Sequence, residues 1–330
     1  MTRLVVGTYA AQGGAGLVPI ADDDGLWSVG DAIGTIRNAS FAVASPRHGY
    51  HYLVDEQAGT LGVYDAAHDW AQVAEVTTGG EAPCHLAVSP DAEHLAVAHY
   101  ESGTIALFDL NDAGLPVTRT ILANVGHGPD PERQRGPHAH WVGFTPSGAL
   151  LCADLGADAV LVRDAVDRTD ARVLYAAPAG SGPRHLARHP TLPVHYLVSE
   201  LAATLTVLRT HGDRLIADRI LPTGGEGGAA DNLGGAIAIA GDRLYASNRG
   251  DDTIATFALD DEGTPHVLGH VGSGGRSPRF LLPLDDRLIV AHEEGGGVGI
   301  LTLDSDGCPQ PDPVLLDIPG AAFVMIDPRR

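Results

Sequence analysis

Arginine, histidine and glutamate residues recur at the ends of short apolar segments along this chain. Arginine is always charged and can donate paired hydrogen bonds to a carboxylate, a phosphate or a developing oxyanion. Histidine and glutamate can accept a proton from water near neutral pH. Residues of these types stand at two kinds of segment end: Glu200, Arg249 and His292 after one kind, and Arg184, His140, Arg279, His138, His85 and His185 at or beside the start of the other. Such a set suits chemistry on an anionic or carbonyl-containing small molecule.

Each of these residues also has a purely structural interpretation. Asp251 and Asp252 stand beside Arg249 and could neutralise it in a salt bridge. Glu200 could serve only to orient Arg184. The segment ends form one site only if the fold brings them together. Which residues meet therefore depends on the elements that carry them.

The apolar segments repeat along the chain. The strings LGVYD, IALFD, LTVLR and IATFA start at residues 61, 105, 205 and 254, and a threonine precedes each. Apolar residues alternate with small or polar ones, as in a half-buried strand. Repeats of about 40–50 residues are typical of the four-stranded blades of a β-propeller. One copy, for example, predicts strands over 85–91, 95–100 and 104–110, followed by a variable fourth strand.

A seventh copy requires both ends of the chain. Six copies start near residues 38, 81, 137, 183, 232 and 277. Residues 321–328 predict an inner strand without a second strand after it, and residues 3–10 predict a second strand without an inner strand before it. Joining the two removes the exposed edges of an open ring. We therefore predict an all-β, seven-bladed β-propeller of four-stranded antiparallel blades, closed by the terminal strands, in a single domain over residues 1–330.

In such blades the entry to the first strand and the turn after the second open on one face, near the axis. The polar segment ends would then converge at one mouth of a central channel. Residues 124–136, rich in Gly, Pro and charge, predict a long loop over one face. His138 and His140 could merely pack beneath that loop.

Five strings carry a resemblance to a known family. They are GEAPCHLAVSPD (80–91), RQRGPHAHWVGFTPSG (133–148), SGPRHLARHP (181–190), YLVSEL (196–201) and LYASNRGDDTIATF (244–257). Over essentially its whole length the chain resembles the lactonase family of seven-bladed β-propellers. That family includes propeller-type 6-phosphogluconolactonases and 3-carboxymuconate lactonising enzymes. The resemblance implies hydrolysis of a sugar-derived or carboxylated lactone in carbohydrate metabolism.

The resemblance also implies roles for individual residues. Its functional positions fall on His138 or His140, Arg184, Glu200 and Arg249. Arg184 or Arg249 would polarise the lactone carbonyl or hold an anionic group, and Glu200, or else His140, would activate water. We predict Glu200, His140, Arg184 and Arg249 as catalytic, and His138, His185, Arg279, His85 and His292 as substrate-binding.

Some positions depart from the family pattern. Phe280 follows Arg279 where the family has histidine, and Gly234-Gly235 stand in place of a Ser-Glu pair. The turn that usually reads Ala-Asn-Gln is Ala-His-Glu at 291–293. These changes fall at the predicted mouth, so they leave the fold prediction intact and the substrate open.

Composition argues against several other functions. All 21 basic residues are arginine, so no lysine can form a Schiff base, and the net charge of −21 disfavours nucleic acid or an anionic membrane as partner. Cys84, Cys152 and Cys308 form no CxxC motif, which disfavours a thiolate zinc site or a disulfide framework. No signal-peptide core or membrane-length apolar run is evident. We expect a cytoplasmic protein with a small-molecule lactone as partner, without a cofactor or a metal.

Three alternatives stay open. The same arginines and proton acceptors could serve a muconate-type cycloisomerase, in which a carboxylate adds to a double bond. A propeller can also bind peptides or proteins without catalysis, although only 3 Trp and 6 Phe are present. A metal-dependent lactonase on six blades would need a Glu, Asn and Asp cluster at the axis, and the number of copies favours seven.

Overall fold

The computed structural model describes residues 2–329, and nearly all of its regular structure is strand. These residues form 28 strands and two short 3₁₀ turns, η1 (Ala10–Gln12) and η2 (Ala66–His68). The strands make seven antiparallel four-stranded sheets. The sheets divide between two compact units, one of residues 2–32 and 184–326 and the other of residues 33–183 and 327–329.

The first unit contains four sheets. In hydrogen-bonded order they are β28 (Ala321–Ile326), β1 (Thr2–Thr8), β2 (Val18–Asp23) and β3 (Leu26–Val29); β16 (Pro183–Arg188), β17 (Val194–Ser199), β18 (Thr204–His211) and β19 (Arg214–Pro222); β20 (Leu233–Ala240), β21 (Arg243–Arg249), β22 (Thr253–Leu259) and β23 (Pro265–Gly272); and β24 (Arg276–Leu284), β25 (Arg287–Gly295), β26 (Val298–Thr302) and β27 (Val314–Leu316).

The second unit contains three sheets. They are β4 (Ala39–Ala44), β5 (His51–Asp55), β6 (Thr60–Asp65) and β7 (Ala71–Thr77); β8 (Pro83–Val88), β9 (His94–His99), β10 (Thr104–Leu110) and β11 (Pro116–Ala123); and β12 (Ala139–Phe144), β13 (Leu150–Asp154), β14 (Ala159–Arg163) and β15 (Ala171–Ala176). Residues 124–138, between β11 and β12, contain no strand.

In every sheet the fourth strand is the least buried. In the third sheet of the chain, β9 and β10 are almost wholly buried, whereas β11 is exposed except at a few positions such as Leu122. The middle strands are covered on both faces, which is why they read as near-continuous apolar runs. The fourth strand has one covered face at most, and its sequence is accordingly more polar and variable.

The core lies between neighbouring sheets within each unit. In the first unit, Val198 and Leu205 share a buried cluster with Phe257 of the next sheet. In the second unit, Leu107 and Cys152 belong to a comparable cluster. Each sheet therefore buries its apolar faces against the sheets beside it, and no sheet has a core of its own.

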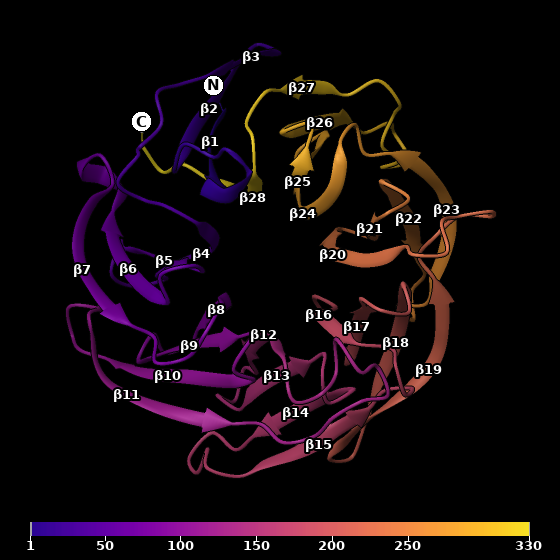
Figure 1. The fold of residues 1–330 in the computed structure, drawn as a ribbon. Helices are drawn as coiled ribbons and strands as arrows, with labels where there is room; N and C mark the ends of the chain where they lie inside the picture. The colour runs from indigo at the N-terminus through magenta and orange to yellow at the C-terminus, as the bar shows by residue number, and fades with distance from the viewer. Residues whose placement is uncertain (1, 330) are drawn as a thin grey trace. The chain divides into compact units, whose positions relative to one another are not determined.

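One sheet joins the two ends of the chain. β28 pairs antiparallel with β1, with Val5 opposite Met325 and Gly7 opposite Phe323, and in Figure 1 the yellow β28 lies beside the indigo β1. Seven four-stranded sheets, one of them closed in this way, make the fold a seven-bladed β-propeller. The predictions of seven blades and of terminal closure are confirmed.

Candidate functional site

Arg184, Glu200 and Arg249 meet in the first unit around one carboxylate oxygen. Arg184 lies at the start of β16, Glu200 directly follows β17, and Arg249 ends β21. Arg184 Nε donates a hydrogen bond to Glu200 Oε2 at 2.9 Å, and Arg249 Nη2 lies 2.6 Å from the same oxygen. Two guanidinium groups around one carboxylate leave a charge of +1. We call these three residues the arginine cluster.

Arg184 is the fixed member of the cluster. Its side chain is 1% exposed, and its Nη1 donates to the carbonyl oxygen of Gly235 at 2.8 Å. The same nitrogen contacts the ring of His185, 3.3 Å from Nε2 and 3.5 Å from Nδ1. A charge this deeply buried is stable only when it is paired and hydrogen bonded. Arg184 therefore holds Glu200 in place.

Gly235 contributes to the arginine cluster in a way that no side-chain pattern could reveal. Its contribution is a backbone carbonyl, which every residue type carries. A Cβ here would collide with Ser247 Oγ and come within 2.8 Å of the Pro278 carbonyl oxygen. The glycine pair at 234–235 therefore allows the close approach of backbone that binds Arg184, and a larger residue at 235 does not fit this backbone.

Arg249 keeps hydrogen-bonding capacity beyond the cluster. Its contact with Glu200 is an ion pair whose angle is not that of a hydrogen bond, and its buried Nε has no hydrogen-bond partner among residues 2–329. The neighbouring carboxylates are used elsewhere: Asp251 Oδ1 and Asp252 Oδ1 accept backbone N–H groups at 2.5 and 2.7 Å. The partner that holds Arg249 is thus Glu200, although Asp251 and Asp252 are adjacent in sequence.

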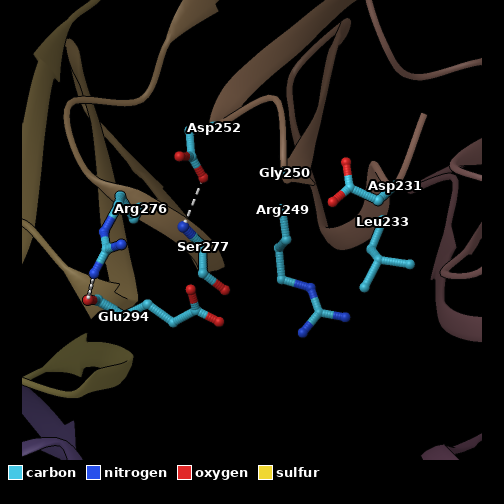
Figure 2. Close-up of a pocket in the computed structure, with 8 residues that line it drawn as sticks. All are labelled: Asp231, Leu233, Arg249, Gly250, Asp252, Arg276, Ser277 and Glu294. Carbon is cyan, nitrogen blue, oxygen red and sulfur yellow. Dashed lines mark hydrogen bonds between the residues drawn. The ribbon is translucent and has the colours of Figure 1, made fainter. Parts of the chain in front are cut away.

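Arg249 lines a pocket of about 380 Å³ in the first unit. Figure 2 shows its guanidinium extending into the space between Leu233 on one side and the Glu294 carboxylate on the other. The residues around the pocket are Asp231, Leu233, Arg249, Gly250, Asp252, Arg276, Ser277 and Glu294. A cationic group that is held from behind by a buried carboxylate and faces an open pocket can bind an oxygen-rich ligand.

Arg279 forms a second ion pair in the same unit. Its Nη1 donates to Glu293 Oε2 at 3.1 Å, with side chains 13% and 21% exposed. The guanidinium carbon also lies 5.3 Å from the centre of the Tyr9 ring, a cation–π distance. The Arg279–Glu293 pair therefore has no net charge, whereas the arginine cluster has a charge of +1.

His292 lies inside its own sheet. It is 0% exposed, with Nδ1 3.1 Å from the Gly297 carbonyl oxygen and Nε2 3.0 Å from Ser273 Oγ. A carbonyl only accepts, so Nδ1 carries the hydrogen and Nε2 accepts from the hydroxyl. Burial lowers the pKa of His292 below its usual 6.5. Both ring nitrogens of this predicted substrate-binding residue are thus committed to holding the turn.

His138 belongs to the second unit, where it is fixed by its neighbours. Its Nδ1 lies 2.7 Å from the Tyr100 carbonyl oxygen, so Nδ1 is the donor and Nε2 the acceptor. Its backbone N–H donates to Asp154 Oδ1 at 2.8 Å, and burial raises the pKa of that carboxyl. The ring of His138 lies 4.6 Å from that of Tyr100. His138 is therefore held in the tautomer that could accept a proton.

His140 and His85 also lie in the second unit, among aromatic rings. His140 is 5% exposed and meets Tyr100 edge-on at 5.5 Å between ring centres. His85 is 6% exposed and lies 4.0 Å from the Phe41 ring and 5.7 Å from the Trp141 ring. Both are more deeply buried than solvated turn residues usually are.

The described residues lack two other features. No group of three His, Cys, Asp or Glu side chains within residues 2–329 is arranged to hold a metal ion. In the same part of the chain, no helix has the length and apolar character needed to cross a membrane.

Comparisons with known proteins agree with this architecture. The family model described as lactonase, 7-bladed β-propeller, matches residues 3–324. The protein YwcC of Lactococcus lactis is 28% identical over 92% of both chains, and a 6-phosphogluconolactonase of Bacillus subtilis is 27% identical over 93% of both. The solved structure of the periplasmic gluconolactonase PpgL of Pseudomonas aeruginosa superposes with a TM-score of 0.88 at 22% identity, covering 98% of each chain.

Proposed function

Because the chain belongs to the lactonase family of seven-bladed β-propellers, we propose that it hydrolyses a lactone at the arginine cluster. The observation that carries the proposal is Arg249, which the buried Glu200 carboxylate holds while its Nε is left without a hydrogen-bond partner among residues 2–329. The relative from Bacillus subtilis is a 6-phosphogluconolactonase, and the Pseudomonas structure is a gluconolactonase. Sugar lactones are therefore the first substrates to test.

Arg249 is assigned the electrophilic role. When water adds to the lactone carbonyl, negative charge develops on the carbonyl oxygen, and a fixed guanidinium stabilises that charge without having to reorganise. Arg249 can donate to this oxygen from the pocket that it lines. Arg184 acts indirectly. It holds the Glu200 oxygen that Arg249 also contacts, and so it helps to position Arg249.

Glu200 is assigned the proton transfer. The attacking water forms a bond to the carbonyl carbon and gives its proton to the carboxylate, the ring C–O bond breaks, and the proton passes to the departing alkoxide. The carboxylate oxygen Oε2 already contacts two guanidinium groups, which leaves Glu200 little capacity to accept a proton. Most of the acceleration should therefore come from Arg249 and the remainder from Glu200.

Substitutions test these assignments. Arg249→Ala and Arg184→Ala should each lower kcat/KM by at least ~10²-fold, as removal of an oxyanion donor or its support does. Glu200→Gln should also lower kcat by ~10²-fold, because an amide cannot accept the proton of the attacking water. Near-wild-type rates in all three variants would exclude this site.

The substrate assay separates the main alternatives. Proton release from a panel of sugar and carboxylated lactones, measured with and without chelator, detects hydrolysis and any metal requirement. Loss of a muconate followed by ultraviolet absorbance detects the cycloisomerase reaction. Lactone hydrolysis above the spontaneous rate supports the proposal, whereas turnover of the muconate alone would replace it.

A further inference from the structure

The pocket beside Arg249 has an acidic lining. Two guanidinium groups, of Arg249 and Arg276, face three carboxylates, of Asp231, Asp252 and Glu294. The pocket therefore carries a charge of −1. Arg184 and Glu200, which support Arg249, have opposite charges, so including them leaves this sum unchanged.

Two of these carboxylates are available to a ligand. Asp252 already accepts the backbone N–H of Ser277 at 2.7 Å. By contrast, the side chains of Asp231 and Glu294 have no hydrogen bond or ion pair with any residue in the described range 2–329. Both residues are exposed. In Figure 2 the Glu294 carboxylate points toward the Arg249 side chain from one side of the pocket, and Asp231 lies on the other side.

Arg276 has only part of its donor set left for a ligand. Its Nη2 donates to the backbone carbonyl oxygen of Glu294 at 2.8 Å, which uses part of its donor set. Arg249 in turn is shared with Glu200. A dianionic phosphate in this pocket would meet the carboxylates of Asp231 and Glu294, whose charges no other described residue pairs.

We propose that this pocket holds the hydroxyl-bearing, unphosphorylated part of a sugar lactone, and that Asp231 and Glu294 are the residues that discriminate against a phosphorylated one. Ionised carboxylates are acceptors only, and they form strong, charge-assisted hydrogen bonds with hydroxyl groups. The same groups repel a phosphate. The inference rests on the proposed lactone hydrolysis and narrows its substrate class.

The test compares glucono-δ-lactone with its 6-phosphorylated form. Initial rates are measured by proton release, with spontaneous hydrolysis subtracted, for the wild type and for the double variant Asp231→Asn/Glu294→Gln. The matched control is Asp261→Asn/Glu262→Gln, which removes two charges from the exposed turn between β22 and β23, outside the pocket. Binding of the two products, gluconate and 6-phosphogluconate, is measured in parallel by calorimetry.

The wild type should prefer the unphosphorylated lactone in kcat/KM and bind gluconate more tightly than 6-phosphogluconate. The pocket variant should shift both ratios toward the phosphorylated form by about tenfold, as expected for two partly exposed charges, and the control should not. A wild type that prefers the phosphorylated ligand, or equal ratios in pocket variant and wild type, overturns the inference. If neither lactone is hydrolysed, lactone hydrolysis fails, and the product affinities still decide the selectivity of the pocket.

Discussion

Replacing Glu200 by glutamine should destabilise the protein far more than the same change at Glu293. Glu200 Oε2 contacts two guanidinium groups, and the side chains of Arg184 and Glu200 are only 1% and 3% exposed. Removing one partner of a buried ion pair costs about 3–5 kcal/mol because the remaining charge stays buried without compensation. Glutamine keeps one acceptor oxygen for Arg184, so we expect about 3 kcal/mol, at the lower end of that range.

Glu293 provides the comparison within the same unit. Its ion pair with Arg279 has the same chemistry, but the side chains are 21% and 13% exposed. Solvent screens such a pair, and its loss should cost below about 1 kcal/mol. With an unfolding entropy of roughly 2.1 cal/mol/K per residue, a cooperative chain of 330 residues loses roughly 1.4 °C in Tm per kcal/mol. Glu200→Gln should thus lower Tm by roughly 4 °C and Glu293→Gln by about 1 °C or less.

The assay is calorimetric unfolding of the three proteins side by side, with urea titration followed by tryptophan fluorescence. The titration shows whether the slope of the unfolding free energy is unchanged, which is needed for a direct comparison. Equal shifts for both variants would refute the reasoning, because they would mean that the deeper burial of Glu200 contributes nothing beyond a partly exposed ion pair.

Further perturbations test other parts of the structure. Deleting residues 321–330 removes β28 and should abolish cooperative unfolding, whereas an unchanged Tm would contradict the terminal closure. Burial lowers the pKa of His99 from its usual 6.5 to about 4 in the folded chain. Between these two pH values the unfolded chain binds a proton at His99 and the folded chain does not. Stability should therefore fall as pH falls through that window, and His99→Gln should flatten this dependence in urea titrations. Gly235→Ala should lower kcat/KM at least about tenfold by displacing the carbonyl that holds Arg184, whereas Gly269→Ala, with open space around it, should match the wild type.

Much of the fold could be predicted from the repeat length and from the apolar middle strands, although these strands are buried on both faces and not half-buried, as their alternation suggested. The string at 105–109 lies within β10, and the residues assigned to the closing blade lie in β1 and β28. These predictions depended on short apolar segments and on a repeat length, both of which are written directly in the residue order. The single-domain organisation and the cytoplasmic location stay predictions.

The site was predictable only in part. His292 and Glu293 stand together at one segment end in the sequence, but side chains of successive strand residues point to opposite faces. The structure accordingly buries His292 within its sheet, whereas Glu293 reaches Arg279. The Gly235 carbonyl carries no side-chain signal, and the choice of Glu200 as partner of Arg249 depends on contacts between distant strands.

The pairing of β28 with β1 has a consequence for synthesis on the ribosome. β1 leaves the exit tunnel before the other strands of this fold, and its partner, residues 321–326, leaves after them. Throughout translation one edge of β1 offers unpaired backbone donors and acceptors to other nascent chains. A chaperone that shields such edges should raise the yield of the full-length chain, and it should do little for a circular permutant in which β28 directly precedes β1.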